Sequence, residues 1–158
     1  LPEVTALRHQ LDVESEQHHF LERSVLDFRW LDEIPVCDPE NLLLIAEGLL
    51  MYFELEQVRA LVDRLRQQFP GATLVFDALG SSSQSQGAKQ LAQLGAPLKW
   101  FIKNERDVAA MGLSLVQVRS LVREKCSYPH RIGIYRWISW ISRLPPIRNA
   151  VLVLETTL

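Results

Sequence analysis

Three carboxylates follow short strand-like runs, and they are the side chains in this sequence best placed to do chemistry. They are Asp27, Glu47 and Asp77. Where such runs form parallel strands of one sheet, their carboxyl ends share an edge, and ligands bind beyond that edge. A carboxylate at this edge can attract a cation or accept hydrogen bonds. We therefore expect the three acids to border a binding site.

Glu47 is the most informative of the three, because it interrupts a run from Leu42 to Phe53 that is otherwise nearly apolar. Burying a carboxylate costs free energy unless it is hydrogen-bonded or paired with a cation. Structural roles stay open beside a binding role. Glu47 can cap a helix that starts near Gly48 or pair with an arginine, and Asp77 can cap a helix N-terminus.

The elements that must position these acids form a strand–helix–strand unit. Leu42 to Ala46 is a continuous apolar run of strand length, as expected for a strand covered by helices on both faces. Apolar residues three and four apart predict an amphipathic helix from Leu55 to Phe69, which Pro70-Gly71 ends. Thr73 to Asp77 is a second strand, and the helical connection predicts that the two strands are parallel.

The chain is expected to form one α/β domain over residues 1–158, with a flexible Ser-rich connector at about 80–87. The further expected elements are a helix from Pro2, a short strand within His18 to Leu26, a helical turn over Phe28 to Ile34, helices over Ala88 to Leu94 and Glu105 to Met111, an extended segment over Leu98 to Ile102, a strand around Leu113 to Val118, a helix over Tyr128 to Leu144 and a last strand over Ala150 to Leu154. Val116 and Gln117 break the alternation expected of a strand.

Charge and composition exclude several classes of function. The 158 residues include 17 Lys+Arg against 19 Asp+Glu, and the formal net charge of −2 provides no basic field for capturing nucleic acid. The longest apolar run is too short to cross ~30 Å of hydrocarbon, so we expect no membrane span. Two cysteines, Cys37 and Cys126, are too few for a disulfide framework, which favours a cytoplasmic setting.

Histidine and cysteine give weaker patterns. His9, His18 and His19 lie close in sequence, but no cysteine or carboxylate lies at zinc-finger spacing, so no metal site is expected. Cys126 precedes His130 by four residues, and without a third orienting group a plain thiol is favoured over a nucleophile.

Two runs of residues resemble a known family of enzymes. Leu44 to Phe53, which contains the string A-E-G-L-L-M-Y, and Phe69 to Leu79 are similar to the leucine carboxyl methyltransferase family, especially its tetracenomycin-type branch of polyketide-synthesis O-methyltransferases. Leu1 to Val4 and Ser24 to Asp32 resemble the same family, in the same order. The match is good from Leu1 to about Leu79 and looser beyond.

The resemblance implies a class I methyltransferase fold, a Rossmann-like sheet flanked by helices, with S-adenosylmethionine as cofactor. It implies transfer of a methyl group to a carboxylate or hydroxyl oxygen of a small molecule, such as an aromatic polyketide acid. The implied cofactor-binding residues are Leu26, Asp27, Phe28, Glu47 and Gly48, and the implied catalytic residue is Tyr52.

Each implied role is chemically reasonable. In the family, the aspartate at the position of Asp27 resembles an acceptor for the adenine amino group, with Leu26 and Phe28 beside the ring. The glutamate at the position of Glu47 lies near the methionine part of the cofactor, and Tyr52 is placed toward the reacting methyl group. Methyl transfer depends mainly on positioning, and a carboxylate acceptor needs no general base.

This sequence departs from the family at its beginning, because it starts after the first two strands and the Gly-rich cofactor loop. We therefore expect the chain to be the C-terminal part of such an enzyme and to be inactive alone, with an exposed apolar sheet edge at Leu42 to Ala46. The alternative is a noncatalytic α/β interaction module derived from the same fold, which would bind a partner through that open edge. The sequence does not specify the oligomeric state.

Overall fold

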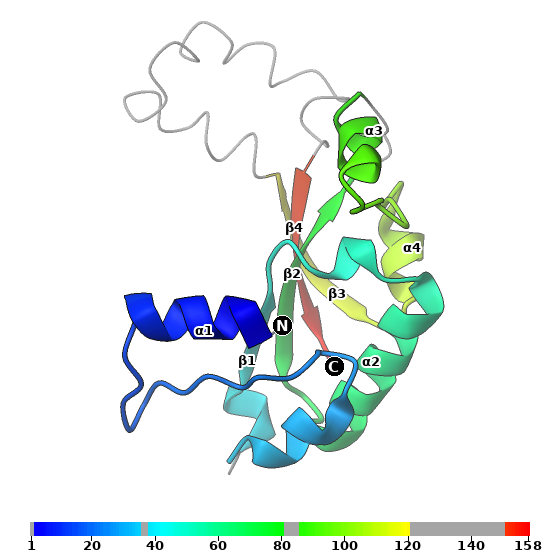
Figure 1. The fold of residues 1–158 in the computed structure, drawn as a ribbon. Coiled ribbons are helices and arrows are strands. Elements are labelled where there is room, and N and C mark those ends of the chain that lie inside the picture. Colours follow the sequence, from blue (N-terminus) through cyan, green and yellow to red (C-terminus); the bar gives the residue numbers. More distant parts are fainter. Residues whose placement is uncertain (1, 36–37, 81–85, 121–150) are drawn as a thin grey trace, which may run out of the picture. The chain divides into compact units, whose positions relative to one another are not determined.

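The computed structural model describes residues 2–35, 38–80, 86–120 and 151–158 (Figure 1). By its internal contacts the chain divides into two compact units, residues 1–37 and 38–158, which are described separately below. The expectation of one domain stays a prediction. The expected helix over Tyr128 to Leu144, both cysteines and most of the Ser-rich connector lie outside the described residues.

The unit of residues 1–37 contains one α-helix and one 3-10 helix. The helix α1 spans Pro2–Leu11, and η1 spans Phe28–Glu33, so both helical predictions are confirmed. The prediction of a strand within His18 to Leu26 is wrong. The backbone pairing of this segment is limited to an isolated bridge from His18 to Ser15. Its backbone is held locally instead, for example by the Glu14 carboxylate, which accepts from the Phe20 amide at 2.8 Å. Without a partner strand, a short run of β-forming residues does not stay extended.

The unit of residues 38–158 is built on a four-stranded mixed sheet. The strands, in the order in which they lie across the sheet, are β1 (Leu43–Ala46), β2 (Thr73–Leu79), β4 (Val151–Thr157) and β3 (Ser114–Ser120). The pair β1 and β2 is parallel, as predicted, and β4 runs antiparallel to both of its neighbours. The break in alternation at Val116 and Gln117 corresponds to a register shift between Leu115 and Gln117.

One short helix precedes the first strand, and further helices lie between the strands. They are η2 (Pro39–Asn41), η3 (Leu50–Tyr52), α2 (Leu55–Gln68), α3 (Gln86–Gln93) and α4 (Glu105–Ala109). The helix α2 begins with a capping box in which Glu54 and Gln57 satisfy each other's backbone amides. After the end of α2, the chain turns back at Gly71, whose positive φ of 83° is a conformation that glycine adopts readily. The helix therefore starts and stops where the sequence predicts.

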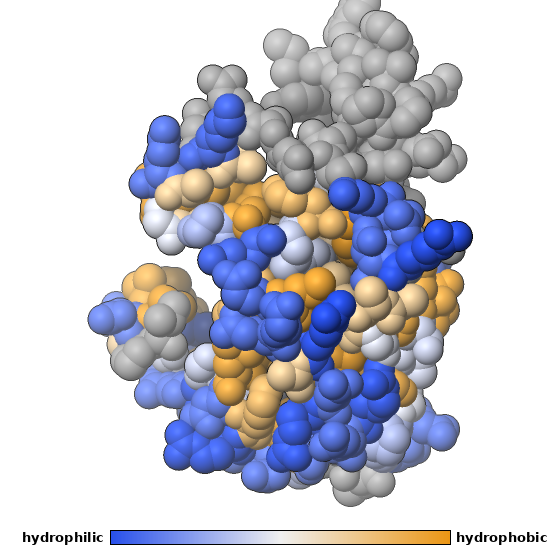
Figure 2. Space-filling model, turned by 90° about the vertical axis from the view of Figure 1, so that its right-hand side faces the viewer, coloured by the Kyte–Doolittle hydropathy of each residue, from blue (hydrophilic) through white to orange (hydrophobic). Residues whose placement is uncertain are grey.

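The core of this unit lies between α2 and one face of the sheet. Along β2, Leu74, Phe76 and Ala78 are buried, and their neighbours in sequence are only half-buried. Val58 and Val62 of α2 are fully buried on the same side. Figure 1 shows α2 running along this side of the sheet, and Figure 2 shows hydrophilic side chains over much of the molecule on that side, with smaller hydrophobic areas between them.

The opposite face of the sheet is open within the described part of residues 38–158. Leu43 is 56% exposed and Ile45 is 69% exposed, and both belong to β1, which has only one neighbouring strand among the described residues. The prediction that helices cover both faces of this strand is therefore wrong here. The predicted exposed apolar edge is present.

The ends of several elements differ from the sequence prediction. The second strand continues to Leu79, so Asp77 lies within it and not after it. The last strand continues to Thr157, three residues beyond the predicted end. The extended segment at Leu98 to Ile102 forms only a bridge from Ile102 to Gly80. In the described residues, no helix is long and apolar enough to cross a membrane.

We predict that Ile45→Lys reduces aggregation of the isolated chain without lowering its stability. The Ile45 side chain is largely exposed, and a lysine on an open strand edge opposes pairing with another chain. Light scattering at increasing concentration and thermal unfolding measure the two effects. Leu44→Lys, one residue earlier on the more buried side of the strand, is the matched control and should cost about 2 kcal/mol or more. Equal aggregation of Ile45→Lys and the unaltered chain would contradict the prediction.

Candidate cofactor-binding site

The first part of the candidate site is the turn that follows β1. Gly48 has a positive φ of 60°, a conformation that side chains other than glycine rarely adopt. A Cβ atom added at Gly48 would meet nothing within 4 Å, so the conformation alone requires glycine and the space beside the turn is open. The turn therefore leaves room for a ligand next to the backbone.

Asp77 fixes this turn. Its Oδ1 atom accepts a hydrogen bond from the Gly48 amide at 2.7 Å, which joins β2 to the end of β1. The sequence left open that Asp77 caps a helix N-terminus. Asp77 instead accepts a hydrogen bond from the backbone amide of a turn, which is a similar structural role. The carboxylate satisfies a backbone donor that the end of the strand leaves unpaired.

Glu47 lies in the same turn and is exposed, so the burial that the sequence suggested does not occur. Among the described residues, its carboxylate neither caps a helix nor pairs with an arginine, which leaves both structural alternatives without support there. An ionised carboxylate with no partner at the end of a parallel strand can bind a cationic ligand group. Glu47 therefore has the chemistry that a binding role requires.

Tyr52 closes the short helix η3, four residues beyond the Gly48 turn. Leu50 and Met51 of the same helix are buried, and the Tyr52 side chain is half-buried. The buried pair anchors η3 against the core and leaves Tyr52 at its edge. Glu47, Gly48 and Tyr52 thus lie in one stretch of chain between β1 and α2.

Asp27 belongs to the other unit, where its carboxylate holds the start of η1. Its Oδ1 accepts from Arg29 Nε at 2.8 Å, and its Oδ2 accepts from Arg29 Nη2 at 2.6 Å. These hydrogen bonds lower the pKa of Asp27 to about 2, and the guanidinium of Arg23 at 3.7 Å acts in the same direction. Asp27 is thus an N-cap in a bidentate ion pair, and it does not follow a strand.

The structure places the predicted cofactor-binding residues in two groups. Glu47 and Gly48 lie in the unit of residues 38–158, whereas Leu26, Asp27 and Phe28 form consecutive residues in the unit of residues 1–37. Leu26 and Phe28, which flank Asp27 in the sequence, are half-buried. Each group contains one acidic residue, Asp27 between two apolar residues and Glu47 before a glycine.

No group of three metal-ligating side chains occurs in the part of the chain that the structure describes. Each of the three N-terminal histidines instead lies near one carboxylate. The distances are 3.8 Å from His9 Nε2 to Glu22, 3.9 Å from His18 Nδ1 to Asp12 and 4.0 Å from His19 Nδ1 to Glu14.

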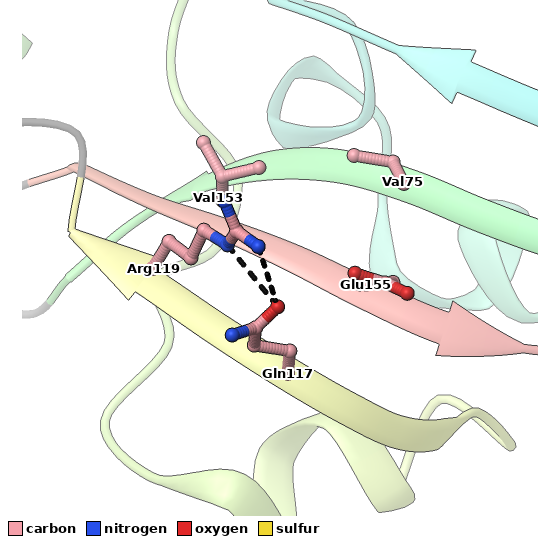
Figure 3. Close-up of a pocket in the computed structure, with 5 residues that line it drawn as sticks. All are labelled: Val75, Gln117, Arg119, Val153 and Glu155. Carbon is pink, nitrogen blue, oxygen red and sulfur yellow. Dashed lines mark hydrogen bonds between the residues drawn. The ribbon is translucent and has the colours of Figure 1, made fainter. Parts of the chain in front are cut away.

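Sequence reasoning missed a shallow pocket of about 280 Å³ on the open face of the sheet (Figure 3). Its lining residues, from three neighbouring strands, are Val75, Gln117, Arg119, Val153 and Glu155. Arg119 Nε and Nη2 both donate to Gln117 Oε1, at 3.1 and 2.9 Å. Gln117 and Arg119 are two residues apart on β3, a spacing that places them on one face of a strand. The pocket also needs Glu155, which lies beyond the predicted end of the last strand.

The fold defined by these elements is a partial Rossmann-like α/β sheet, which confirms the fold class expected from the sequence. A solved structure of a DUF574 family protein from Streptomyces avermitilis matches 99% of this chain and 62% of its own, with a TM-score of 0.63 and 15% sequence identity. The N-methyltransferase NodS from Bradyrhizobium japonicum covers 99% of this chain and 68% of its own, with a TM-score of 0.48 and 13% identity.

Among proteins of known function, the tetracenomycin polyketide synthesis O-methyltransferase TcmP from Streptomyces glaucescens is 28% identical to the chain over 110 residues. The match covers 68% of this chain and 40% of that protein. The matched part thus spans less than half the length of this relative. No protein-family model matches the chain.

We predict that Asp77→Ala lowers the free energy of unfolding by about 1 kcal/mol, because the Gly48 amide loses its acceptor. Asp77→Asn should cost much less, since the amide oxygen can still accept that hydrogen bond. Urea unfolding gives the stability of each variant, and hydrogen exchange of the Gly48 amide reports the local contact. Equal losses in the two variants would show that the negative charge matters and the hydrogen bond does not.

We predict that Asp27 remains ionised to about pH 2, because the Arg29 guanidinium stabilises its charged form. Its folded-state pKa lies below the ordinary value of 3.8, so its stabilising contribution is complete above about pH 4 and is lost as the pH falls toward 2. A ¹³C NMR titration of the Asp27 carboxyl carbon measures the midpoint.

Arg29→Gln should move the Asp27 midpoint up toward 3.8, whereas Arg64→Gln on the exposed side of α2 should leave it unchanged. A midpoint near 3.8 in the unaltered chain is the result that this interpretation does not allow.

Proposed function

We propose that this chain is part of an S-adenosylmethionine-dependent O-methyltransferase that acts on a small molecule. The observation that carries the proposal is the string from Ala46 to Tyr52, which forms the end of β1, the Gly48 turn and η3. The 28% identity to TcmP over 110 residues and the fold shared with the DUF574 protein support it.

The residues of the turn fit the chemistry of this cofactor, which supplies a methyl group on a positively charged sulfonium and carries an ammonium group. Glu47 offers an exposed carboxylate with no partner among the described residues, and it would attract these positive charges. Gly48 leaves open space beside the backbone, where a side chain would otherwise stand. Tyr52 would border the reacting group from the end of η3.

The role proposed for Asp27 is more demanding. An acceptor for an adenine amino group needs a free oxygen lone pair, and Arg29 already engages both carboxylate oxygens of Asp27. Each oxygen can accept more than one hydrogen bond, so the ion pair leaves capacity for one further donor. In this proposal Arg29 keeps Asp27 ionised and oriented, and Leu26 and Phe28, its neighbours in sequence, border the adenine ring.

The methyl acceptor in this proposal is a carboxylate or hydroxyl oxygen of a small molecule, for which a polyketide acid is a suitable candidate. A carboxylate acceptor is favoured because neither Glu47 nor Tyr52 is coupled to a histidine that would serve as a general base among the described residues. Catalysis would then rest on holding the acceptor oxygen in line with the reacting methyl group.

We also propose that the 158 residues alone are inactive and bind the cofactor weakly. The match covers 40% of TcmP, and the face of β1 that carries Leu43 and Ile45 is uncovered in the described residues. A cofactor site that needs further strands and a Gly-rich loop would be incomplete without them.

Calorimetric titration with S-adenosylhomocysteine tests the proposal on two samples, the 158-residue chain and the product of the natural open reading frame that contains it. We predict micromolar binding for the open reading frame product and no micromolar binding for the chain. In the former, Glu47→Gln should weaken binding by roughly 1 kcal/mol, about fivefold, because an exposed charged contact is screened by water. Asp27→Ala should weaken it by ~1–3 kcal/mol.

Glu56→Gln, an exposed acid on α2, is the matched control and should leave affinity unchanged. Unchanged affinity in both site variants would remove the proposed roles of Glu47 and Asp27. Absence of binding by the open reading frame product would favour the noncatalytic interaction module instead.

A further inference from the structure

The helix η3 is too short to define its own geometry. It contains three residues, and its two local hydrogen bonds are long, at 3.3 Å from the Tyr52 amide to Leu49 and 3.2 Å from the Phe53 amide to Leu50. Short 3-10 turns have poorer hydrogen-bond geometry than α-helices. The turn therefore holds its own backbone weakly, and contacts from outside it contribute to the orientation of Tyr52.

Those contacts come from two consecutive residues almost fifty positions later. The indole Nε1 of Trp100 donates to the Leu50 carbonyl at 3.1 Å, and the Lys99 amide donates to the Met51 carbonyl at 2.9 Å. Trp100 is 9% exposed, so the indole hydrogen bond is shielded from water. Two successive carbonyls of η3 are thus bound by two successive residues of another segment.

A third contact extends this attachment past the turn. Lys99 Nζ lies 2.6 Å from the Glu54 carboxylate, at the residue that caps α2. The segment that carries Lys99 and Trp100 is itself tied to the end of β2, because the Ile102 amide donates to the Leu79 carbonyl at 2.9 Å. Ile102 is buried. Residues 99–102 therefore link η3 to the end of β2 and to the buried core.

We infer that Trp100, together with Lys99, is a positioning residue for Tyr52 in the proposed methyl-transfer site. The role in methyl transfer rests on the proposed function, whereas the attachment of η3 does not. Tyr52 makes no hydrogen bond through its hydroxyl in the described residues, so its placement depends on the backbone that Trp100 holds.

The test compares Trp100→Phe with Trp30→Phe. Phenylalanine keeps an aromatic ring but removes the indole donor. Trp30 is a matched control because its indole donates to the Val25 carbonyl at 3.0 Å, a contact within the unit of residues 1–37. Trp100→Phe should speed hydrogen exchange of the Tyr52 and Phe53 amides about tenfold. Trp30→Phe should leave them unchanged.

A spectroscopic signature separates positioning of Tyr52 from a general loss of stability. In chain labelled with 3-fluorotyrosine, Trp100→Phe should shift or broaden the ¹⁹F resonance of Tyr52, which Tyr52→Phe assigns by its disappearance. Amides in the middle of α2 should keep their exchange rates. An unmoved Tyr52 resonance, or equal exchange in the Trp100 and Trp30 variants, would overturn the inference.

If Trp100→Phe does not fold, the unaltered chain still decides the question. The indole proton of Trp100 and the amides of Tyr52 and Phe53 should exchange with rates that imply one shared opening, within about threefold after correction for intrinsic rates. An indole that exchanges far faster than these amides would overturn the inference. Both measurements are made without cofactor, so their outcome is independent of the calorimetric test of the proposed function.

Discussion

The hydrogen bond from the Gly48 amide to the Asp77 carboxylate is the contact on which the candidate site depends. At 2.7 Å it ties the exit of β1 to the neighbouring strand, at the edge where both strands run toward their carboxyl ends. The position of Glu47 follows from it, because Glu47 directly precedes the held amide. The path into η3 follows as well, since only Leu49 separates Gly48 from that helix.

The acids that the sequence singles out differ in what they can offer a ligand. Asp77 accepts a hydrogen bond from a backbone amide. Asp27 pairs with Arg29, and this interaction lowers the pKa of Asp27 to about 2. Glu47 is exposed and has no partner in the described residues. Acidic residues that the sequence places after predicted strands thus serve as a turn anchor, a helix cap and a candidate ligand for a cation. Local hydrogen-bond donors decide which role each acid takes.

Much of the fold could be predicted from local patterns. The apolar spacing from Leu55 onward, together with Pro70-Gly71, gave the helix α2 and its end, and the two flanking apolar runs gave a parallel pair. The strand within His18 to Leu26 could not be judged this way, because a strand exists only where a partner exists. The contact of Trp100 with Leu50 was also out of reach, since a link across fifty residues leaves no local periodicity.

The sequence proposes residues for the candidate site but does not specify their environments. The string from Ala46 to Tyr52 proposes Glu47, Gly48 and Tyr52, whose roles stay predictions, and the structure places them at the end of β1, in the Gly48 turn and in η3. The exposure of Glu47 and the occupation of Asp27 by Arg29 depend on neighbours that sequence spacing does not specify.

The strand order β1-β2-β4-β3 has a consequence for how this chain folds during its synthesis. The strand β4, made of residues 151–157, lies between β2 and β3, and among the described residues it is the strand that pairs with β3. The strands β1 and β2 can pair with each other, with α2 across them, before those residues have left the ribosome, whereas residues 114–120 can pair with β4 only afterwards. Completion of the sheet is therefore a late, long-range event, of the kind that slows folding and extends the period in which chaperones act.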